Sequence, residues 1–240
     1  MYILEFIPSG LLVVLLGLLV RRRIYAALPC FFAYAAFAVV ADVVRFAVHN
    51  HHDCYYVIYW ATEAGYDILG MLVMYEVLRT VLGSKTSANR SLLIFAAVFV
   101  AGIGLSLARA QSVPPKVSGL LLYIVLGEIA VRFVQVIVFA GLVTIVPVLG
   151  LRWRQYPFGV ATGFGLYATV MLIVTTKFSD FGTRFKFLWG RTSLVAYSVA
   201  VLIWIWFFSV PQKVDTTSSQ LSVPSPGDLN RYKDVLRRMR

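Results

Sequence analysis

The chain has 240 residues, of which 60% are hydrophobic and 14% are charged. A soluble domain has about 45–50% apolar and about 25% charged residues, so this composition excludes an ordinary soluble protein. The 22 Lys and Arg residues outnumber the 11 Asp and Glu residues. In so apolar a chain, that excess indicates the basic cytoplasmic loops of a multi-span membrane protein rather than a nucleic-acid-binding protein.

Seven segments are long and apolar enough to cross a bilayer, which takes about 20 mostly apolar residues. They are Ile3–Val20, Tyr25–His49, Tyr55–Leu82, Ser91–Ala108, Val117–Leu149, Pro157–Lys177 and Trp189–Val210. We therefore predict an all-α bundle of seven transmembrane helices over residues 1–210. The first segment is not predicted to be a cleaved signal peptide, because Arg21, Arg22 and Arg23 follow it instead of preceding it.

The basic residues predict how this bundle is oriented in the membrane. With the N-terminus outside, 14 of the 22 Lys and Arg residues lie on the cytoplasmic side and six lie outside. The remaining two, Arg45 and Arg132, lie within spans. Because Lys and Arg are enriched in cytoplasmic loops, we predict an N-terminus outside and a C-terminus inside.

Residues 211–240 have a different composition and are predicted to form a cytoplasmic segment. Thr216–Gly227 is rich in Ser, Thr and Pro and predicts a flexible linker. Asp228 is placed to cap a short basic amphipathic helix over Leu229–Met239. Such a helix is suited either to the anionic inner leaflet or to docking on a cytoplasmic protein.

Ionisable residues within spans are costly and therefore mark candidate functional positions. In the third segment, Glu63 and Asp67 share a helical face with Tyr56 and Trp60. Asp67 lies near the middle of that segment. The second and fifth segments carry charges at matching depths. The candidate ligand or ion pocket consists of Asp42, Arg45, Tyr56, Trp60, Glu63, Asp67, Glu128, Arg132 and Gln135. Asp67 and Arg132 are the expected central partners.

The charges of this pocket do not balance. Four carboxylates and two guanidinium groups leave a net charge of −2 if all of them are ionised. Either one or two carboxyls then carry a proton, or a cation or cationic ligand occupies the pocket. A purely structural interpretation stays open, in which the charges pair with one another and fix the helix register.

Two further groups of residues are predicted to lie outside the pocket. Glu76 faces away from Asp67 and is spaced to form a structural ion pair with Arg79. His49, His51, His52 and Asp53 form a short loop at the mouth. That loop is compatible with a divalent metal site, with a pH-sensitive rim or with a plain solvated loop. No cofactor is predicted.

Glycines predict close packing of two helices. Gly159, Gly163 and Gly165 would let the sixth helix approach a neighbour closely, and Gly102 and Gly104 would do the same for the fourth.

The third segment contains the string Tyr59-Trp60-x2-Glu63, followed by Tyr75-Glu76-x2-Arg79. This string resembles that of uncharacterised bacterial seven-helix membrane proteins. The likeness covers about one helix, and it implies no site and no activity.

Absent residues exclude two families of seven-helix proteins. Leu194–Phe208 contains no Lys, which excludes a retinal protein of the rhodopsin family. All three histidines lie in one loop, which excludes the seven-helix zinc amidohydrolases.

We expect an inner-membrane receptor or sensor whose pocket opens outward and which signals through a separate cytoplasmic protein. The alternative is a proton- or cation-coupled transporter that uses the buried carboxylates. An intramembrane enzyme ranks third, because no nucleophile or metal site accompanies the carboxylates. The expected partners are the lipid bilayer and a small ligand or cation, and the oligomeric state stays open.

Overall fold

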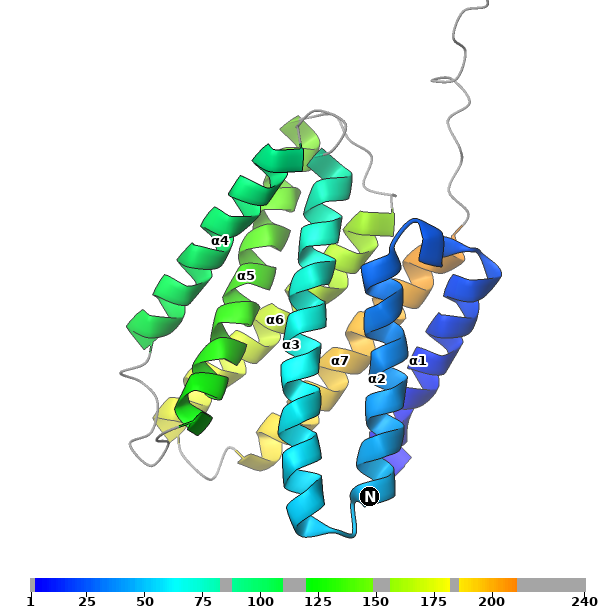
Figure 1. Ribbon diagram of the computed structural model, residues 1–240, viewed down its shortest axis with the longest axis vertical. Helices are drawn as coiled ribbons and strands as arrows, with labels where there is room; N and C mark the ends of the chain where they lie inside the picture. Colours follow the sequence, from blue (N-terminus) through cyan, green and yellow to red (C-terminus); the bar gives the residue numbers. More distant parts are fainter. Residues whose placement is uncertain (1–2, 83–87, 110–119, 149–155, 182–185, 211–240) are drawn as a thin grey trace, which may run out of the picture. The chain divides into compact units, whose positions relative to one another are not determined.

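Long apolar runs separated by short turns fold into seven α-helices in the computed structural model (Figure 1). The structure describes residues 3–82, 88–109, 120–148, 156–181 and 186–210. The helices are α1 Ile3–Arg21, α2 Pro29–Val48, α3 His52–Leu82, α4 Ala88–Arg109, α5 Leu120–Val148, α6 Tyr156–Phe181 and α7 Lys186–Ser209, and a short 3₁₀ helix, Ile24–Ala26, joins α1 to α2. No strand occurs within these ranges, so the prediction of an all-α fold is confirmed for them.

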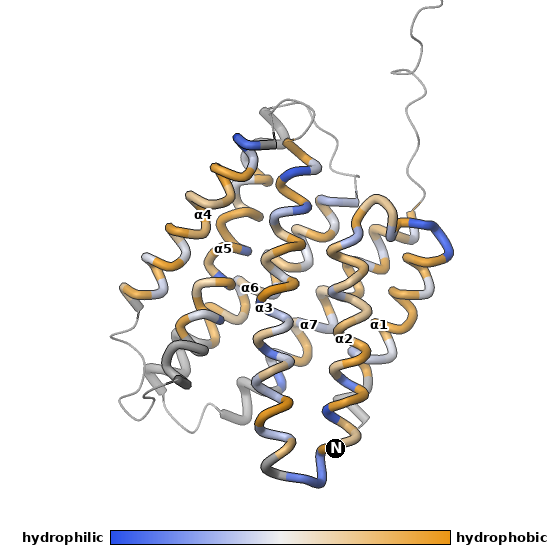
Figure 2. The backbone as a smooth tube through the Cα atoms, in the orientation of Figure 1, coloured by the Kyte–Doolittle hydropathy of each residue, from blue (hydrophilic) through white to orange (hydrophobic). Residues whose placement is uncertain are grey.

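Five of the helices, α2, α4, α5, α6 and α7, are long and apolar enough to cross a membrane. The apolar part of α1 whose side chains the structure describes, Ile7–Arg21, is shorter. Helix α3 has the length but carries charged residues along it. Figure 2 shows this contrast, with hydrophobic residues over most of α4 and hydrophilic residues at several points of α3. The chain is therefore a helical-bundle protein with several helices capable of spanning a membrane.

Successive helices run in opposite directions, and each packs against the next (Figure 1). Helix α7 also packs against α1, which closes the helices into a ring, and α3 crosses the ring to contact α5 and α6. The guanidinium of Arg22 donates a hydrogen bond of 2.6 Å to the carbonyl of Ser209. This bond joins the end of α1 to the end of α7.

The core of the bundle is aromatic where α2, α6 and α7 meet. The Trp204 ring lies 5.1 Å from Phe31 and 4.9 Å from Phe164, measured between centroids. Its Nε1 donates to the carbonyl of Val160 at 3.2 Å. The outward faces are also apolar, and Leu93 on α4 is 69% exposed. A helical bundle with apolar residues on both faces is suited to a lipid environment.

Glycines let α6 approach its neighbours closely, as predicted. A Cβ on Gly163 would overlap the Trp204 indole of α7, and one on Gly165 would overlap Phe139 of α5. On α4, a Cβ on Gly102 would meet Val134 of α5, whereas Gly104 faces open space. The prediction for the fourth helix is therefore correct for Gly102 and wrong for Gly104.

Glu76 has a structural role, but its partner is not Arg79. Its two carboxylate oxygens accept hydrogen bonds from the backbone N–H groups of Cys30 and Phe31, both at 3.0 Å. These are orphan donors of the first turn of α2, whose N-cap residue Leu28 provides no side-chain cap. The predicted ion pair with Arg79 is wrong, because the helix N-terminus offers donors and a partial positive charge whereas Arg79 is exposed.

Candidate functional site

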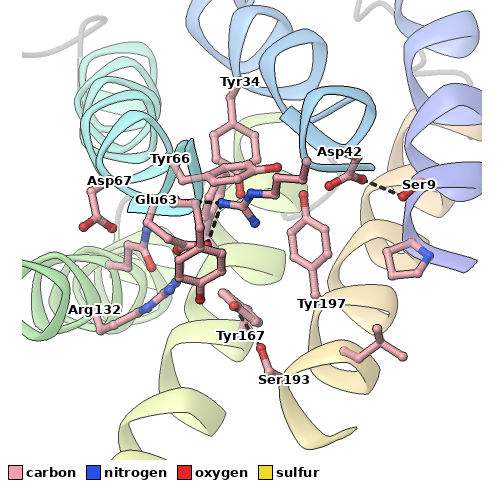
Figure 3. A pocket seen from close by; sticks show the side chains of 16 residues that line it. Ser9, Tyr34, Asp42, Glu63, Tyr66, Asp67, Arg132, Tyr167, Ser193 and Tyr197 are labelled. Atoms are coloured by element: carbon pink, nitrogen blue, oxygen red, sulfur yellow. Dashed lines mark hydrogen bonds and ion pairs between the residues drawn. The ribbon is translucent and has the colours of Figure 1, made fainter. Parts of the chain in front are cut away.

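A cavity of about 400 Å³ lies between six of the seven helices, all except α4 (Figure 3). It is lined by Pro8, Ser9, Tyr34, Asp42, Arg45, Tyr59, Glu63, Tyr66, Asp67, Arg132, Gln135, Phe164, Tyr167, Ser193, Leu194 and Tyr197. Its volume is at the lower end of the range for small-molecule sites, about 300–1,000 Å³. Its lining is polar and aromatic, in contrast to the apolar outer faces of the helices.

Arg45 of α2 is fully engaged by α3. Its Nη2 lies 2.9 Å from Oε1 of Glu63, and its Nε donates to Thr62 Oγ1 at 2.7 Å. The guanidinium also lies over the rings of Tyr59 and Tyr66, with its Cζ 4.7 and 5.5 Å from their centroids. Charge pairing and cation–π contact together hold this arginine against one wall of the cavity.

Arg132 of α5 is only partly satisfied. Its Nη2 lies 3.2 Å from Oε1 of Glu128, one turn earlier on the same helix, and its Cζ lies 4.7 Å from the Tyr167 centroid. Its Nε is buried and has no hydrogen-bond partner among the described residues. The predicted direct ion pair with Asp67 is not formed, because Glu128 is within reach on the same helix face.

Two carboxylates of the cavity have no cationic partner within ion-pair distance in the described ranges. Asp42 accepts a hydrogen bond of 2.6 Å from the neutral Ser9 hydroxyl, which Figure 3 marks. Asp67 makes neither a hydrogen bond nor an ion pair with the described part of the chain.

Gln135 is the most deeply buried polar side chain of the cavity. It is 2% exposed, and its Oε1 has no hydrogen-bond partner within the described ranges. An unsatisfied buried amide oxygen costs free energy, about 1–3 kcal/mol. Arg132 and Gln135 both line the cavity, and each has one buried side-chain atom, Nε and Oε1 respectively, without a hydrogen-bond partner among the described residues.

The structure brings six of the nine predicted pocket residues to the cavity, namely Asp42, Arg45, Glu63, Asp67, Arg132 and Gln135. Glu128 contributes through Arg132 without lining the cavity itself. Tyr56 and Trp60 are not part of the lining. Tyr56 lies two turns before Glu63 and is 58% exposed, and the aromatic wall is formed by Tyr59 instead.

Neither His49 nor His51, the two histidines whose side chains the structure describes, lines this cavity. His49 is exposed and stacks on Phe46, and His51 is also exposed. The side chains of His52 and Asp53 lie outside those that the structure describes. Among the described side chains, no group of three His, Cys, Asp or Glu residues is placed to hold a metal ion. A metal site at this loop stays a prediction.

Half of the ten lining residues that the sequence did not predict are tyrosines. These are Tyr34, Tyr59, Tyr66, Tyr167 and Tyr197. Tyrosine in membrane helices is typical of the interfaces, where its hydroxyl meets water. Tyrosines in the interior of apolar segments were a usable signal, because a buried hydroxyl requires a polar neighbour.

One side of the cavity is closed by the aromatic core. Tyr34 and Phe164 line the cavity and lie 4.9 Å apart by centroids. Behind them lie Phe31, Trp204 and Phe208, which are fully buried. On this side of the cavity the described side chains are therefore aromatic, and the buried polar side chains of the described ranges are Ser91, Ser106 and Gln135.

No protein-family model, no curated protein and no solved structure matches this chain.

Proposed function

We propose that this chain is a receptor- or sensor-like integral membrane protein whose cavity binds a small ligand. The observation that carries the proposal is a cavity within an otherwise apolar bundle. Its lining includes Asp42 and Asp67, which form no ion pair with described residues, together with Arg132 and Gln135, each of which has a buried atom without a hydrogen-bond partner there. Helical bundles rarely retain unpaired charged or polar side chains that have no functional role, because each costs free energy in a low-dielectric interior. The proposal assigns the cavity to binding and not to catalysis.

We further propose seven spans in a bacterial inner membrane, with the N-terminus outside. The alternating direction of the helices supports this topology, as does the basic cluster Arg21, Arg22 and Arg23 at the far end of α1 from Ser9. Asp42 lies near the end of α2 that leads into the α2–α3 turn. In this orientation the cavity belongs to the outer half of the bundle and takes its ligand from outside.

On this proposal the signal passes to a separate cytoplasmic protein. The surfaces proposed for that contact are the cytoplasmic loops and the predicted basic helix Leu229–Met239, which lies outside the described residues. Ligand binding would act on α1, α2, α3, α5, α6 and α7 together, because all six line the cavity. A change in their packing is the means by which occupancy reaches the cytoplasmic end.

A proton- or cation-coupled transporter is the second candidate, and the unpaired carboxylate of Asp67 favours it. The aromatic closure behind Tyr34 and Phe164 supports the receptor instead. Liposomes that contain the full chain separate the two, because only a transporter gives a proton or cation flux that Asp67→Asn abolishes.

The test of ligand binding uses thermal unfolding of the detergent-purified full chain with small cationic, neutral and anionic compounds. We expect at least one compound to raise the midpoint of the wild type and to lose its effect in Gln135→Met. Ser91→Ala is the matched control, because Ser91 is also a buried, unsatisfied polar residue but lies outside the cavity lining. If no compound stabilises the wild type, or if Gln135→Met responds equally, the proposed function is wrong.

A further inference from the structure

We propose that the ligand of the cavity is a small organic ammonium ion that carries an uncharged hydrogen-bond acceptor. This inference rests on the proposed function and names the chemical class that the cavity selects. It follows from three features of the site: its charge, its unsatisfied hydrogen-bonding groups and its aromatic walls.

The charge of the site favours a cation. Arg45 is paired with Glu63, and Arg132 is paired with Glu128. Asp42 and Asp67 remain, so the site carries a net charge of −2 when all of its groups are ionised. A bound cation offsets part of this charge, and in a low-dielectric site that gain is larger than it is in water.

The position of the unsatisfied groups defines where the cation binds. Gly70 lets α3 approach α5 closely, since a Cβ there would lie 3.2 Å from Nε2 of Gln135. Asp67 is one turn before Gly70, and Arg132 is one turn before Gln135. Asp67 and Arg132 therefore belong to the same level of the α3–α5 contact.

An ammonium group matches this level of the cavity. It donates a hydrogen bond to the Asp67 carboxylate, which no described residue uses, and a second to Oε1 of Gln135 once the amide rotates and turns this buried oxygen toward the cavity. The Nε–H of Arg132 is an unused donor beside them, so the ligand supplies an acceptor to it. All three groups are satisfied by one molecule that carries an amine and an acceptor a few bonds away.

The acceptor of the ligand is uncharged. Arg132 already has Glu128 as its counter-ion. A ligand carboxylate would therefore add a fifth negative group to a site with two guanidinium groups, and zwitterionic amino acids are disfavoured. A hydroxyl or a carbonyl accepts the same hydrogen bond without this penalty.

The walls favour an organic cation over a metal ion. Tyr34, Phe164 and Tyr197 present aromatic surface to the cavity, which an apolar or aromatic ligand body fills. In the described part of the chain, no three His, Cys, Asp or Glu side chains converge as a divalent metal requires.

The test is a series of matched compounds on the detergent-purified full chain, followed by calorimetric titration. The probe is 2-amino-1-phenylethanol. The comparison compounds are 1-phenyl-1,2-ethanediol, which replaces the amine by a hydroxyl, and the zwitterion phenylalanine. We expect the amino alcohol to bind at least tenfold more tightly than either, because the diol leaves Asp67 without a cation and phenylalanine adds a negative charge.

Two variants locate the bound amine. Asp67→Asn is expected to lower the affinity for the amino alcohol by about 10- to 100-fold, which corresponds to the loss of a hydrogen bond to a charged group. Glu76→Gln is the control, because it makes the same change of carboxylate to amide at the α2 N-terminus, away from the cavity, and is expected to leave the affinity unchanged. Since Asp67→Asn could fail to fold, the compound series on the wild type decides the ligand class by itself.

The outcomes separate this inference from the proposed function. If the diol or phenylalanine binds as tightly as the amino alcohol, or if folded Asp67→Asn retains full affinity, the ammonium inference is wrong and a binding cavity still stands. If none of the three compounds binds the wild type but other uncharged or anionic compounds do, the inference is again overturned alone. If no compound of any charge binds, the inference and the proposed function fail together.

Discussion

Glu76 shows how an apolar helix accommodates a carboxylate without a cationic side chain. Its two oxygens cap the first turn of α2 through Cys30 and Phe31. At this helix N-terminus the carboxylate meets both free N–H donors and the positive end of the helix dipole. The charge is thereby paired with backbone groups, and it anchors α3 to α2 at the end of the bundle away from the cavity.

We predict that Glu76→Gln lowers the thermal unfolding midpoint of the detergent-purified protein. The loss of a charged cap corresponds to about 0.5–2 kcal/mol of stability. Arg79→Gln is the control and is expected to change the midpoint little, because Arg79 is exposed and forms no ion pair with Glu76. Equal losses from both substitutions would instead support an ion pair between them.

The α6–α7 contact depends on residues without side chains. Gly163 lies against Trp204, which is 1% exposed and is held by its hydrogen bond to Val160. The buried indole therefore cannot move away from an added methyl group without disturbing this packing and its hydrogen bond. In a membrane, where apolar burial offers little driving force between helices, such close packing is a main source of helix association.

We predict that Gly163→Ala destabilises the bundle by about 1–3 kcal/mol, the usual cost of overpacking. Gly104→Ala is the matched control, since it makes the same change in a helix but meets open space. We expect its unfolding midpoint to stay the same or to rise slightly, because Ala favours a helix over Gly. Measured in one detergent, equal effects of the two substitutions would contradict the packing described for α6.

The two native cysteines, Cys30 and Cys54, allow the proposed topology of the whole molecule to be tested. Cys54 is exposed near the start of α3, and Cys30 is half-buried near the start of α2. Cys30 lies at one end of α2, and Cys54 follows the turn at its other end. The two cysteines therefore lie on opposite faces of a membrane that α2 spans.

We predict that a membrane-impermeant thiol reagent labels Cys54 in intact cells, and that Cys54→Ser removes the labelling. Cys30→Ala, the control, is expected to leave the labelling unchanged. Labelling that requires permeabilised cells would reverse the orientation, and with it the proposal that the ligand comes from outside.

Hydropathy and helical periodicity predicted the seven helices and the level at which the charged residues lie, because both depend on residue spacing along one chain. Six cavity residues were predicted for this reason. Pairing was not predictable, because Glu76 and Arg132 each had more than one partner within reach and only the packing of the helices decides between them. The role of Ser9 was equally hidden, because its partner Asp42 lies on another helix.

The contact of α1 with α7 has a consequence for how the protein is made. Arg22 and its partner Ser209 are separated by 187 positions, so α1 leaves the ribosome long before α7 exists. At about 5–20 residues per second, the delay is roughly 10–40 s. During that interval α1 lacks the packing against α7 that it has in the finished bundle. We therefore expect the ring of helices to close last at the α1–α7 contact, and a chain truncated before α7 to leave this side of α1 uncovered.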